Sequence, residues 1–152
     1  ITYLPKGGGS TNMSQLTMMT PGKGIKGVKE LVLERIASME GKPCPPTVVG
    51  IGLGGSASMA ISLAKKSLLR PVGDFHEDSK IAKLEQELKE RANNLGVGPM
   101  GVGGDTTVLD VKIEYNHRHP ASYPVGITPQ CWANRRTLFR ITPEGEIEEA
   151  GG

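Results

Sequence analysis

The chain of 152 residues is 37% hydrophobic and 22% charged, which is enough apolar material for one domain with its own core. Its net charge of +2, with basic and acidic residues interleaved, argues against nucleic acid as a partner. No apolar run reaches about 18 residues and no secretory leader pattern stands at the start. We therefore expect no membrane association and a cytoplasmic location, where both cysteines stay reduced.

The first part of the chain predicts an extended start, a glycine turn and a helix. Residues 1–5 have an extended pattern, and Lys6-Gly7-Gly8-Gly9-Ser10-Thr11-Asn12 follows as a loop. This tract is either a flexible linker or a nest of backbone N–H groups that binds an oxyanion beside Lys6. Apolar residues recur at helical spacing from Lys23 to Met39, which predicts an amphipathic helix that Gly41 closes.

The next stretch sets a cysteine before a strand, a glycine loop and a second helix. Cys44 precedes two prolines, whose fixed φ values keep it outside regular structure, as suits a ligand or a nucleophile. The apolar run from Thr47 to Leu53 is typical of an interior strand, and Ser56 begins a helix that reaches Leu69. Glycines between the strand and the helix expose N–H groups, which favours an anion.

Gly50, Gly52 and Gly55 match the dinucleotide-binding pattern G-x-G-x-x-G between a strand and a helix. That pattern also requires an acidic residue about 20 positions further on, at the end of a second strand. The candidate Asp74 stands instead in a polar loop after Pro71. A nucleotide-binding domain is therefore an alternative that the acidic position does not support.

A third helix follows this loop. Asp78 is placed to cap a helix whose apolar residues run from Ile81 to Leu95, with pairs of the Glu85–Lys89 type on its surface. Gly96 ends the helix and begins a second glycine-rich connection, residues 96–107.

The last part of the chain predicts strands. Residues 108–115 alternate between apolar and polar, as a half-buried strand does. The side chains expected on its solvent face are Asp110, Lys112 and Glu114. A further strand is expected at 122–128, followed by a turn at Pro129, and another at 137–141.

Several side chains suit chemistry, but each has a simpler interpretation. His117 and His119 resemble half of a zinc site, yet the paired cysteine spacing of zinc sites is absent. Cys44 and Cys131 stand far apart in the sequence and are either ligands or two buried free thiols. Arg135-Arg136 is either a solvated pair or a clamp for carboxylates.

A set of ordered blocks carries a family resemblance over essentially the whole chain. The blocks are Pro5-Lys6-Gly7-Gly8-Gly9-Ser10, Asn12-Met13-Ser14, Gly41-Lys42-Pro43-Cys44-Pro45-Pro46, Gly50-Ile51-Gly52-Leu53-Gly54-Gly55-Ser56, Leu63-Ala64-Lys65-Lys66-Ser67-Leu68-Leu69-Arg70, Gly98-Pro99-Met100-Gly101-Val102-Gly103-Gly104-Asp105-Thr106-Thr107, and His119-Pro120-Ala121-Ser122-Tyr123-Pro124-Val125 ahead of Cys131-Trp132-Ala133. They resemble the alpha subunit, or N-terminal domain, of the class I fumarase and L-tartrate dehydratase family of iron–sulfur hydro-lyases.

The resemblance, together with the predicted elements, implies an α/β fold in which mixed β-sheets pack with amphipathic helices in a single domain. Residues 1–152 then correspond to the C-terminal portion of the cluster-binding alpha domain. The family holds a [4Fe–4S] cluster on three cysteines, and Cys44 and Cys131 match the second and third. The first belongs to a Cys-Gln-Asp-Thr-Gly block that this sequence does not contain.

The resemblance also implies roles for other residues. His119 matches an active-site histidine that contacts substrate or handles a proton. Lys6, Gly7, Gly8 and Gly9 match a block that binds a substrate carboxylate, in agreement with the nest interpretation.

The expected activity is a component of a hydro-lyase that reversibly dehydrates a 2-hydroxy dicarboxylate, malate to fumarate. The alternatives are the alpha subunit of an L-tartrate dehydratase, which forms oxaloacetate, and a non-catalytic association module without a cluster. The expected partners are a beta subunit or C-terminal domain that completes the site, the dicarboxylate substrate, and further copies in a homodimer or an α2β2 assembly. We expect the chain to be inactive alone.

Overall fold

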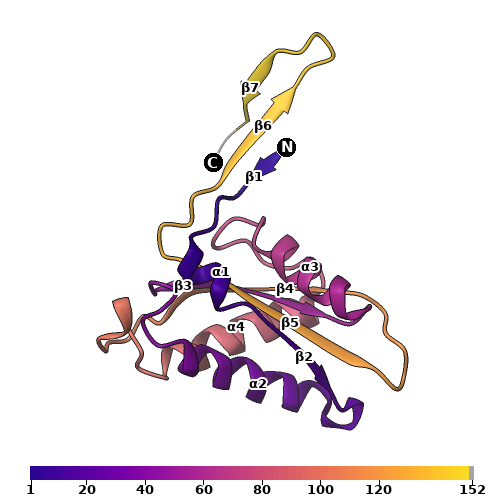
Figure 1. The fold of residues 1–152 in the computed structure, drawn as a ribbon, viewed down its shortest axis with the longest axis vertical. Coiled ribbons are helices and arrows are strands. Elements are labelled where there is room, and N and C mark those ends of the chain that lie inside the picture. Colours follow the sequence, from indigo (N-terminus) through magenta and orange to yellow (C-terminus); the bar gives the residue numbers. More distant parts are fainter. Residues whose placement is uncertain (151–152) are drawn as a thin grey trace.

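A four-stranded mixed sheet forms the centre of the computed structural model, which describes residues 1–150 (Figure 1). Its strands are β2 (Gln15–Met19), β3 (Thr47–Leu53), β4 (Val108–Tyr115) and β5 (Tyr123–Gln130). They lie in the order β2-β5-β3-β4, with β3 parallel to β4 and the other neighbours antiparallel. The inner strands β3 and β5 are buried along their whole lengths, which confirms the interior strand predicted at 47–53.

Three helices cover the two faces of this sheet. α2 (Gly24–Met39) and α4 (Ser79–Asn93) lie on one face, and α3 (Ala57–Ser67) lies on the other (Figure 1). The apolar periodicity predicts all three helices, and the structure confirms the N-terminal caps of α3 and α4. The Ser56 hydroxyl accepts a hydrogen bond from the N–H of Met59 at 3.2 Å, and the Asp78 carboxylate accepts one from the N–H of Lys80 at 2.8 Å.

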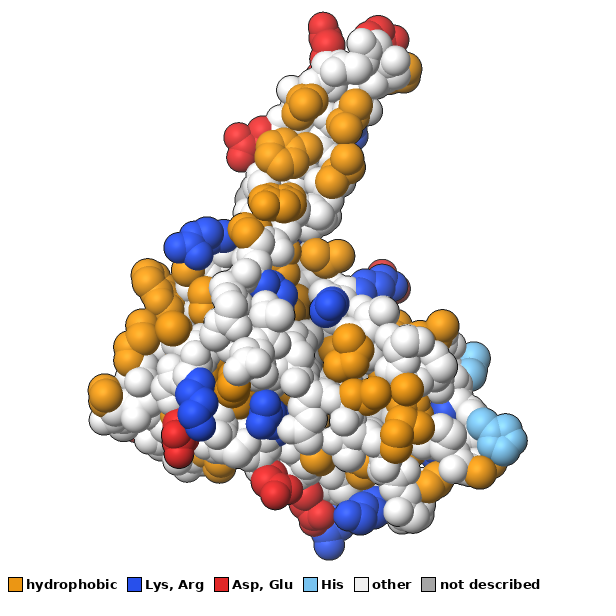
Figure 2. Space-filling model, in the orientation of Figure 1, with side chains coloured by type: hydrophobic (Ala, Val, Ile, Leu, Met, Phe, Trp, Pro, Cys, Tyr) orange, Lys and Arg blue, Asp and Glu red, His pale blue; other side chains and the backbone are white. Residues whose placement is uncertain are grey.

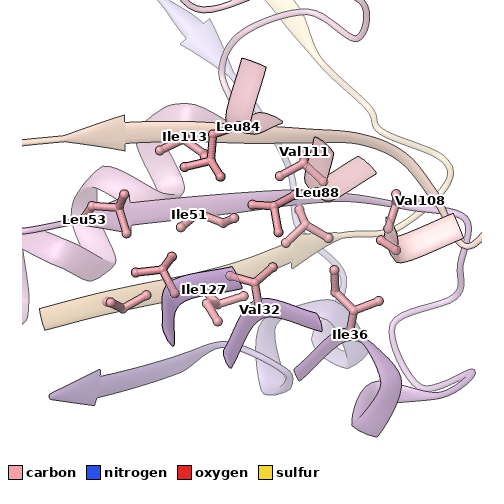
Figure 3. Packing of buried hydrophobic residues seen from close by; sticks show 14 of the residues in the cluster. Val32, Ile36, Ile51, Leu53, Leu84, Leu88, Val108, Val111, Ile113 and Ile127 are labelled. Carbon is pink, nitrogen blue, oxygen red and sulfur yellow. The ribbon is translucent and has the colours of Figure 1, made fainter. Parts of the chain in front are cut away.

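The main core fills the space between the sheet and the helices α2 and α4 (Figure 3). The buried side chains that meet there include Val32, Ile36, Ile51, Leu53, Leu84, Leu88, Val108, Val111, Ile113 and Ile127. Full burial of each such side chain is worth about 1.5–3 kcal/mol relative to exposure, so this layer dominates the stability of the domain. The predicted α/β fold with a mixed sheet and amphipathic helices is confirmed.

α3 packs so closely on the opposite face that three strand residues beneath it must be glycine. A Cβ atom on Gly126 would lie 2.5 Å from the backbone oxygen of Ala60, and one on Gly52 would lie 2.6 Å from the nitrogen of Ala64. A Cβ atom on Gly50 would collide with the backbone oxygen of Ala64. Close helix packing therefore accounts for two glycines of the dinucleotide-like pattern without any nucleotide.

The expectation that the polar face of β4 is solvated is wrong. Asp110 is nearly buried and Lys112 is completely buried, because the segment between α3 and α4 covers them. The ammonium of Lys112 lies 2.8 Å from the Asp110 carboxylate and also donates to the backbone oxygen of Asp74. Glu85 of α4 is also buried, where it pairs with Arg70 instead of lying in a surface pair. Buried charges of this kind require partners that a local pattern does not reveal.

A second, three-stranded sheet forms an arm that projects from the body (Figure 1). Its strands are β1 (Thr2–Tyr3), β6 (Thr137–Ile141) and β7 (Ile147–Glu149), in the antiparallel order β1-β6-β7. This confirms the extended start and the strand expected at 137–141.

Short helical turns connect these elements: α1 (Gly8–Asn12), η1 (Pro21–Lys23) and η2 (Pro99–Gly101). α1 shows that the tract at 6–12, expected to be a loop, instead folds into one helical turn. The strand expected to stop before Pro129 continues through it, with Pro129 opposite Val49 of β3.

The end of α2 also differs from the expectation. Glu40, rather than Gly41, adopts the left-handed backbone conformation there, with φ of +50°. Gly41 is needed for a different reason, since a Cβ atom on it would collide with the backbone oxygen of Met100. The glycine therefore permits a close approach between two loops.

Candidate functional site

Cys44 and Cys131 lie at the same end of the main sheet. Cys44 stands shortly before β3, and Cys131 directly follows β5. Because these strands are antiparallel, with Val48 opposite Gln130, the start of one adjoins the end of the other. The N–H of Trp132 donates a hydrogen bond to the backbone oxygen of Cys44 at 3.1 Å. Both thiols are free, and the structure brings the two expected ligand segments together.

The backbone of Cys44 is held in an unusual conformation. Its φ of +56° lies in the left-handed region, which costs a non-glycine residue about 1 kcal/mol. Its N–H donates to the backbone oxygen of Gly41 at 3.0 Å, and the N–H of Met100 donates to the oxygen of Pro45 at 2.9 Å. The second glycine-rich segment thus braces the cysteine loop, and the expectation of a non-helical backbone at Cys44 is confirmed.

The glycine turn packs against this cysteine loop. Gly7 precedes α1, and its oxygen accepts the N–H of Thr11 at 3.0 Å. A Cβ atom on Gly9 would lie 2.8 Å from the backbone oxygen of Lys42, two residues before Cys44. A Cβ atom on Gly8 would meet no other atom within 4 Å, so this position faces open space. The N–H groups of the first turn are therefore presented beside the cysteine loop.

Lys6 joins the glycine turn to the Cys131 end of β5. Its ammonium donates to the backbone oxygen of Pro129, two residues before Cys131. Burial lowers the pKa of Lys6 from 10.5 to about 8, while the neighbouring Cys131 raises it and Lys65 lowers it. Lys6 therefore remains mainly protonated at neutral pH and places a positive charge beside a cysteine.

His119 lies far from this cluster of residues. His117 and His119 are both exposed on the loop between β4 and β5, and the N–H of Ala121 donates to Nδ1 of His119 at 3.1 Å. The eight residues of β5 separate this loop from Cys131 by about 26 Å at the usual rise of a strand. A single chain therefore does not bring the expected active-site histidine to the expected cysteine ligands.

A hollow of about 560 Å³ lies beside the histidine loop, at the carboxyl ends of β3 and β4. Arg118 covers the ring of Tyr123 there, with its guanidinium carbon 4.4 Å from the ring centre. Burial raises the pKa of Tyr123, and the Arg118 charge opposes that shift. The sequence interpretation did not single out these two residues, which stand beside the expected histidine.

The arginine pair does not form a shared clamp. The guanidinium of Arg136 donates to the backbone oxygen of Leu69 at 2.8 Å, while Arg135 is exposed. Trp132, Met100 and Gly41 were also missing from the residues expected at the site. Their signal was membership of the blocks that carry the family resemblance, which assigned them no role.

Residues 1–150 contain no cluster of three or more His, Cys, Asp or Glu side chains arranged to hold a metal ion. The described helices include none with the length and apolar character needed to span a membrane.

The sequence matches the family model of fumarate hydratase (Fumerase) over residues 1–140. The chain belongs to this fumarate hydratase family. Membership confirms the resemblance that the glycine and cysteine blocks suggested, and it covers the cysteine loop, the glycine turn and the histidine loop alike.

Relatives of this family member carry a more specific name. The chain is 56% identical over 147 residues to a putative L(+)-tartrate dehydratase subunit alpha of Methanocaldococcus jannaschii, covering 97% of this chain and 52% of the relative. It is 40% identical over 135 residues to the L(+)-tartrate dehydratase subunit alpha of Escherichia coli K12, covering 89% of this chain and 45% of the relative. The chain thus spans about half the length of these curated relatives.

Proposed function

We propose that the chain is the cluster-binding portion of the alpha component of a hydro-lyase that dehydrates a 2-hydroxy dicarboxylate. The names of the relatives favour L-tartrate, with oxaloacetate as product, over malate and fumarate. The proposal includes a beta subunit or C-terminal domain that supplies the rest of the site, and a cytoplasmic location.

The observation that carries this proposal is the gathering of three separate sequence blocks at one end of the sheet. The blocks are Lys6 with the glycine turn at 7–9, the loop of Cys44, and the end of β5 at Cys131, and they are remote from one another in sequence. Two free thiols, a lysine ammonium and unpaired N–H groups of a first helical turn suit an anionic substrate beside a thiolate-bound metal group.

Two cysteine thiolates fit a [4Fe–4S] cluster in donor type, and Cys44 and Cys131 would hold it together with a third ligand from outside this chain. When bound with one open iron, such a cluster supplies a Lewis acid for the hydroxyl group of the substrate. The left-handed backbone of Cys44 supports this role, because strained residues gather at ligand sites.

The chain's own groups would bind and orient the substrate. The N–H groups of Gly8 and Gly9 precede the first helical hydrogen bonds of α1, so they remain donors for a carboxylate. The Lys6 ammonium adds a positive charge that offsets the charge of the Cys131 thiolate and of the substrate.

The proposed role of His119 in substrate contact or proton handling requires a second protomer. β5 keeps the histidine about 26 Å from Cys131 of its own chain. A site that uses both residues would therefore combine the cysteine end of one chain with the histidine loop of another, which agrees with the expected homodimer or α2β2 assembly.

The cluster assignment is tested in the complete enzyme, purified without oxygen, by comparing Cys44→Ser and Cys131→Ser with the exposed control Ser62→Ala. Bound iron and sulfide, and the dehydration of L-tartrate and malate, are measured for each. Each cysteine variant should lose iron and at least about a hundredfold in turnover, while the control keeps both. Full iron content and turnover in either cysteine variant would contradict the assignment.

The histidine assignment is tested by co-expressing His119→Asn with Cys44→Ser, each inactive alone. If the two residues act from different chains, mixed dimers regain one intact site, which gives about a quarter of wild-type activity for random pairing. No recovery in the mixture would contradict a site shared between two chains.

A further inference from the structure

The two edge strands of the main sheet, β4 and β2, differ in whether their outward backbone groups are hydrogen-bonded. At the β4 edge, side chains form hydrogen bonds with the backbone groups that point outward. The Glu85 carboxylate accepts the N–H of Ile113 at 2.6 Å, and Arg70 donates to the oxygen of the same residue at 3.2 Å. Asn93 accepts the N–H groups of Thr107 and Val108 at 2.9 and 2.8 Å. This edge is closed to a further strand.

The β2 edge has no such cover among the residues that the structure describes. Met18 stands opposite Pro124, which has no N–H, and the oxygen of Pro124 accepts from Gly54 on the β3 side. Backbone bonding alternates along antiparallel strands, so Gln15, Thr17 and Met19 bond to β5. The N–H and C=O groups of Leu16 and Met18 therefore point away from the sheet, toward the free edge.

The side chains of this edge are apolar and exposed. Leu16 is 40% exposed and Met18 is 56% exposed, and both project to the face that carries α3. Figure 2 shows apolar side chains gathered on the visible face of the body in this region. β2 carries no charged residue, although natural edge strands usually carry lysine or proline to prevent pairing.

We propose that the β2 edge binds the β2 edge of a second copy of this chain, antiparallel, which joins the two sheets into one of eight strands. In that register Thr17 faces Thr17, and Leu16 of each copy faces Met18 of the other. Residues 16 and 18 are the ones with free outward backbone groups, so the strand is complementary to itself. Each exposed apolar side chain would then be covered by its counterpart.

The charges on the surface beside β2 are also compatible with a second copy at this edge. A hollow of about 260 Å³ between β2 and α2 is lined by Glu34 and Arg35 together with Gln15 and Thr17. Because Glu34 and Arg35 carry opposite charges, a second copy related by a two-fold axis through Thr17 would not set a surface of one sign against itself. Antiparallel pairing also brings the Met19 end of each strand, beside the 116–122 loop, level with the Gln15 end of its partner.

The proposal concerns association only, so its test is independent of the proposed activity. Two double variants are made, one with Leu16→Lys and Met18→Lys and one with Leu16→Glu and Met18→Glu. Opposed like charges should weaken self-association of either variant at least about tenfold in sedimentation equilibrium. An equimolar mixture should form mixed dimers, because each lysine then faces a glutamate. Val102→Lys, at another exposed apolar position, should dimerise like the wild type.

A second measurement uses the unmodified chain, so the test holds even if a variant fails to fold. Amide exchange at Leu16 and Met18 should slow as the protein concentration rises through the dimer dissociation constant. The amides of Thr17 and Met19 should be protected at every concentration, since β5 already binds them. A monomeric wild type, or dimers in which Leu16 and Met18 exchange as freely as in the monomer, would overturn the proposal.

Discussion

Replacing Gly52 by alanine tests the close contact between α3 and the sheet. The new Cβ atom would lie 2.6 Å from the nitrogen of Ala64, 2.9 Å from Cβ of Leu63 and closer still to the oxygen of Ala60. Two of these atoms are backbone, so no side-chain rotation relieves the overlap. The helix would have to move outward by about 1 Å, which also opens its contacts with Gly50 and Gly126.

Overpacking of this kind typically costs 1–3 kcal/mol, and a backbone clash belongs at the upper end, so we expect a loss of about 3 kcal/mol in the free energy of unfolding. With an m-value of about 2 kcal/mol/M, the urea midpoint should fall by about 1.5 M. The control is Gly22→Ala, whose Cβ atom meets nothing within 4 Å, and it should leave the midpoint unchanged or slightly higher. A Gly52→Ala midpoint within about 0.3 M of wild type would refute the packing argument.

Three further results are expected. Glu85→Ala should cost about 3 kcal/mol in urea unfolding, because it leaves Arg70 with only one ion pair, its longer contact to Glu114, and leaves the N–H of Ile113 without its acceptor. A cost below about 1 kcal/mol would show that the pair is solvated. Burial lowers the pKa of Lys6 from 10.5 to about 8, so the unfolded chain binds this proton more tightly than the folded chain does. As the pH rises from about 8 to 10.5, the free energy of unfolding of the wild type should therefore increase by about 1–2 kcal/mol relative to Lys6→Met. A difference in stability that stays constant with pH would contradict the shift. The isolated chain, with two thiolates from Cys44 and Cys131, should lose iron during anaerobic gel filtration after reconstitution, unless another group replaces the third ligand.

The helices and inner strands were predictable because their signals are local. Apolar periodicity and the capping residues Ser56 and Asp78 define α3 and α4 without knowledge of what packs against them. The polar face of β4 was mispredicted for the opposite reason. Alternation shows that Asp110 and Lys112 share a face, but not that a remote loop covers it and supplies the backbone oxygen of Asp74.

The candidate site shows the same division. The family resemblance places Cys44, Cys131 and Lys6 in one site, and the antiparallel pairing of β3 and β5 brings their segments together. The match at His119 gave a role but no position in space. Only the length of β5 shows that this histidine stands at the opposite end of the sheet from Cys131.

The projecting arm has a consequence for the order of folding. β1 pairs with β6, with Thr2 opposite Leu138, so its strands meet only after almost the whole intervening chain has been brought into place. Contacts of such long sequence separation form slowly, and those between β6 and β7 bury little apolar surface to drive an earlier association. The body, whose helices form locally and whose sheet and helices bury a large apolar core, would form first, and the strands of the arm would pair afterwards. Under mild denaturant the same strands should separate before the core opens, which makes the arm the earliest site of proteolytic cutting.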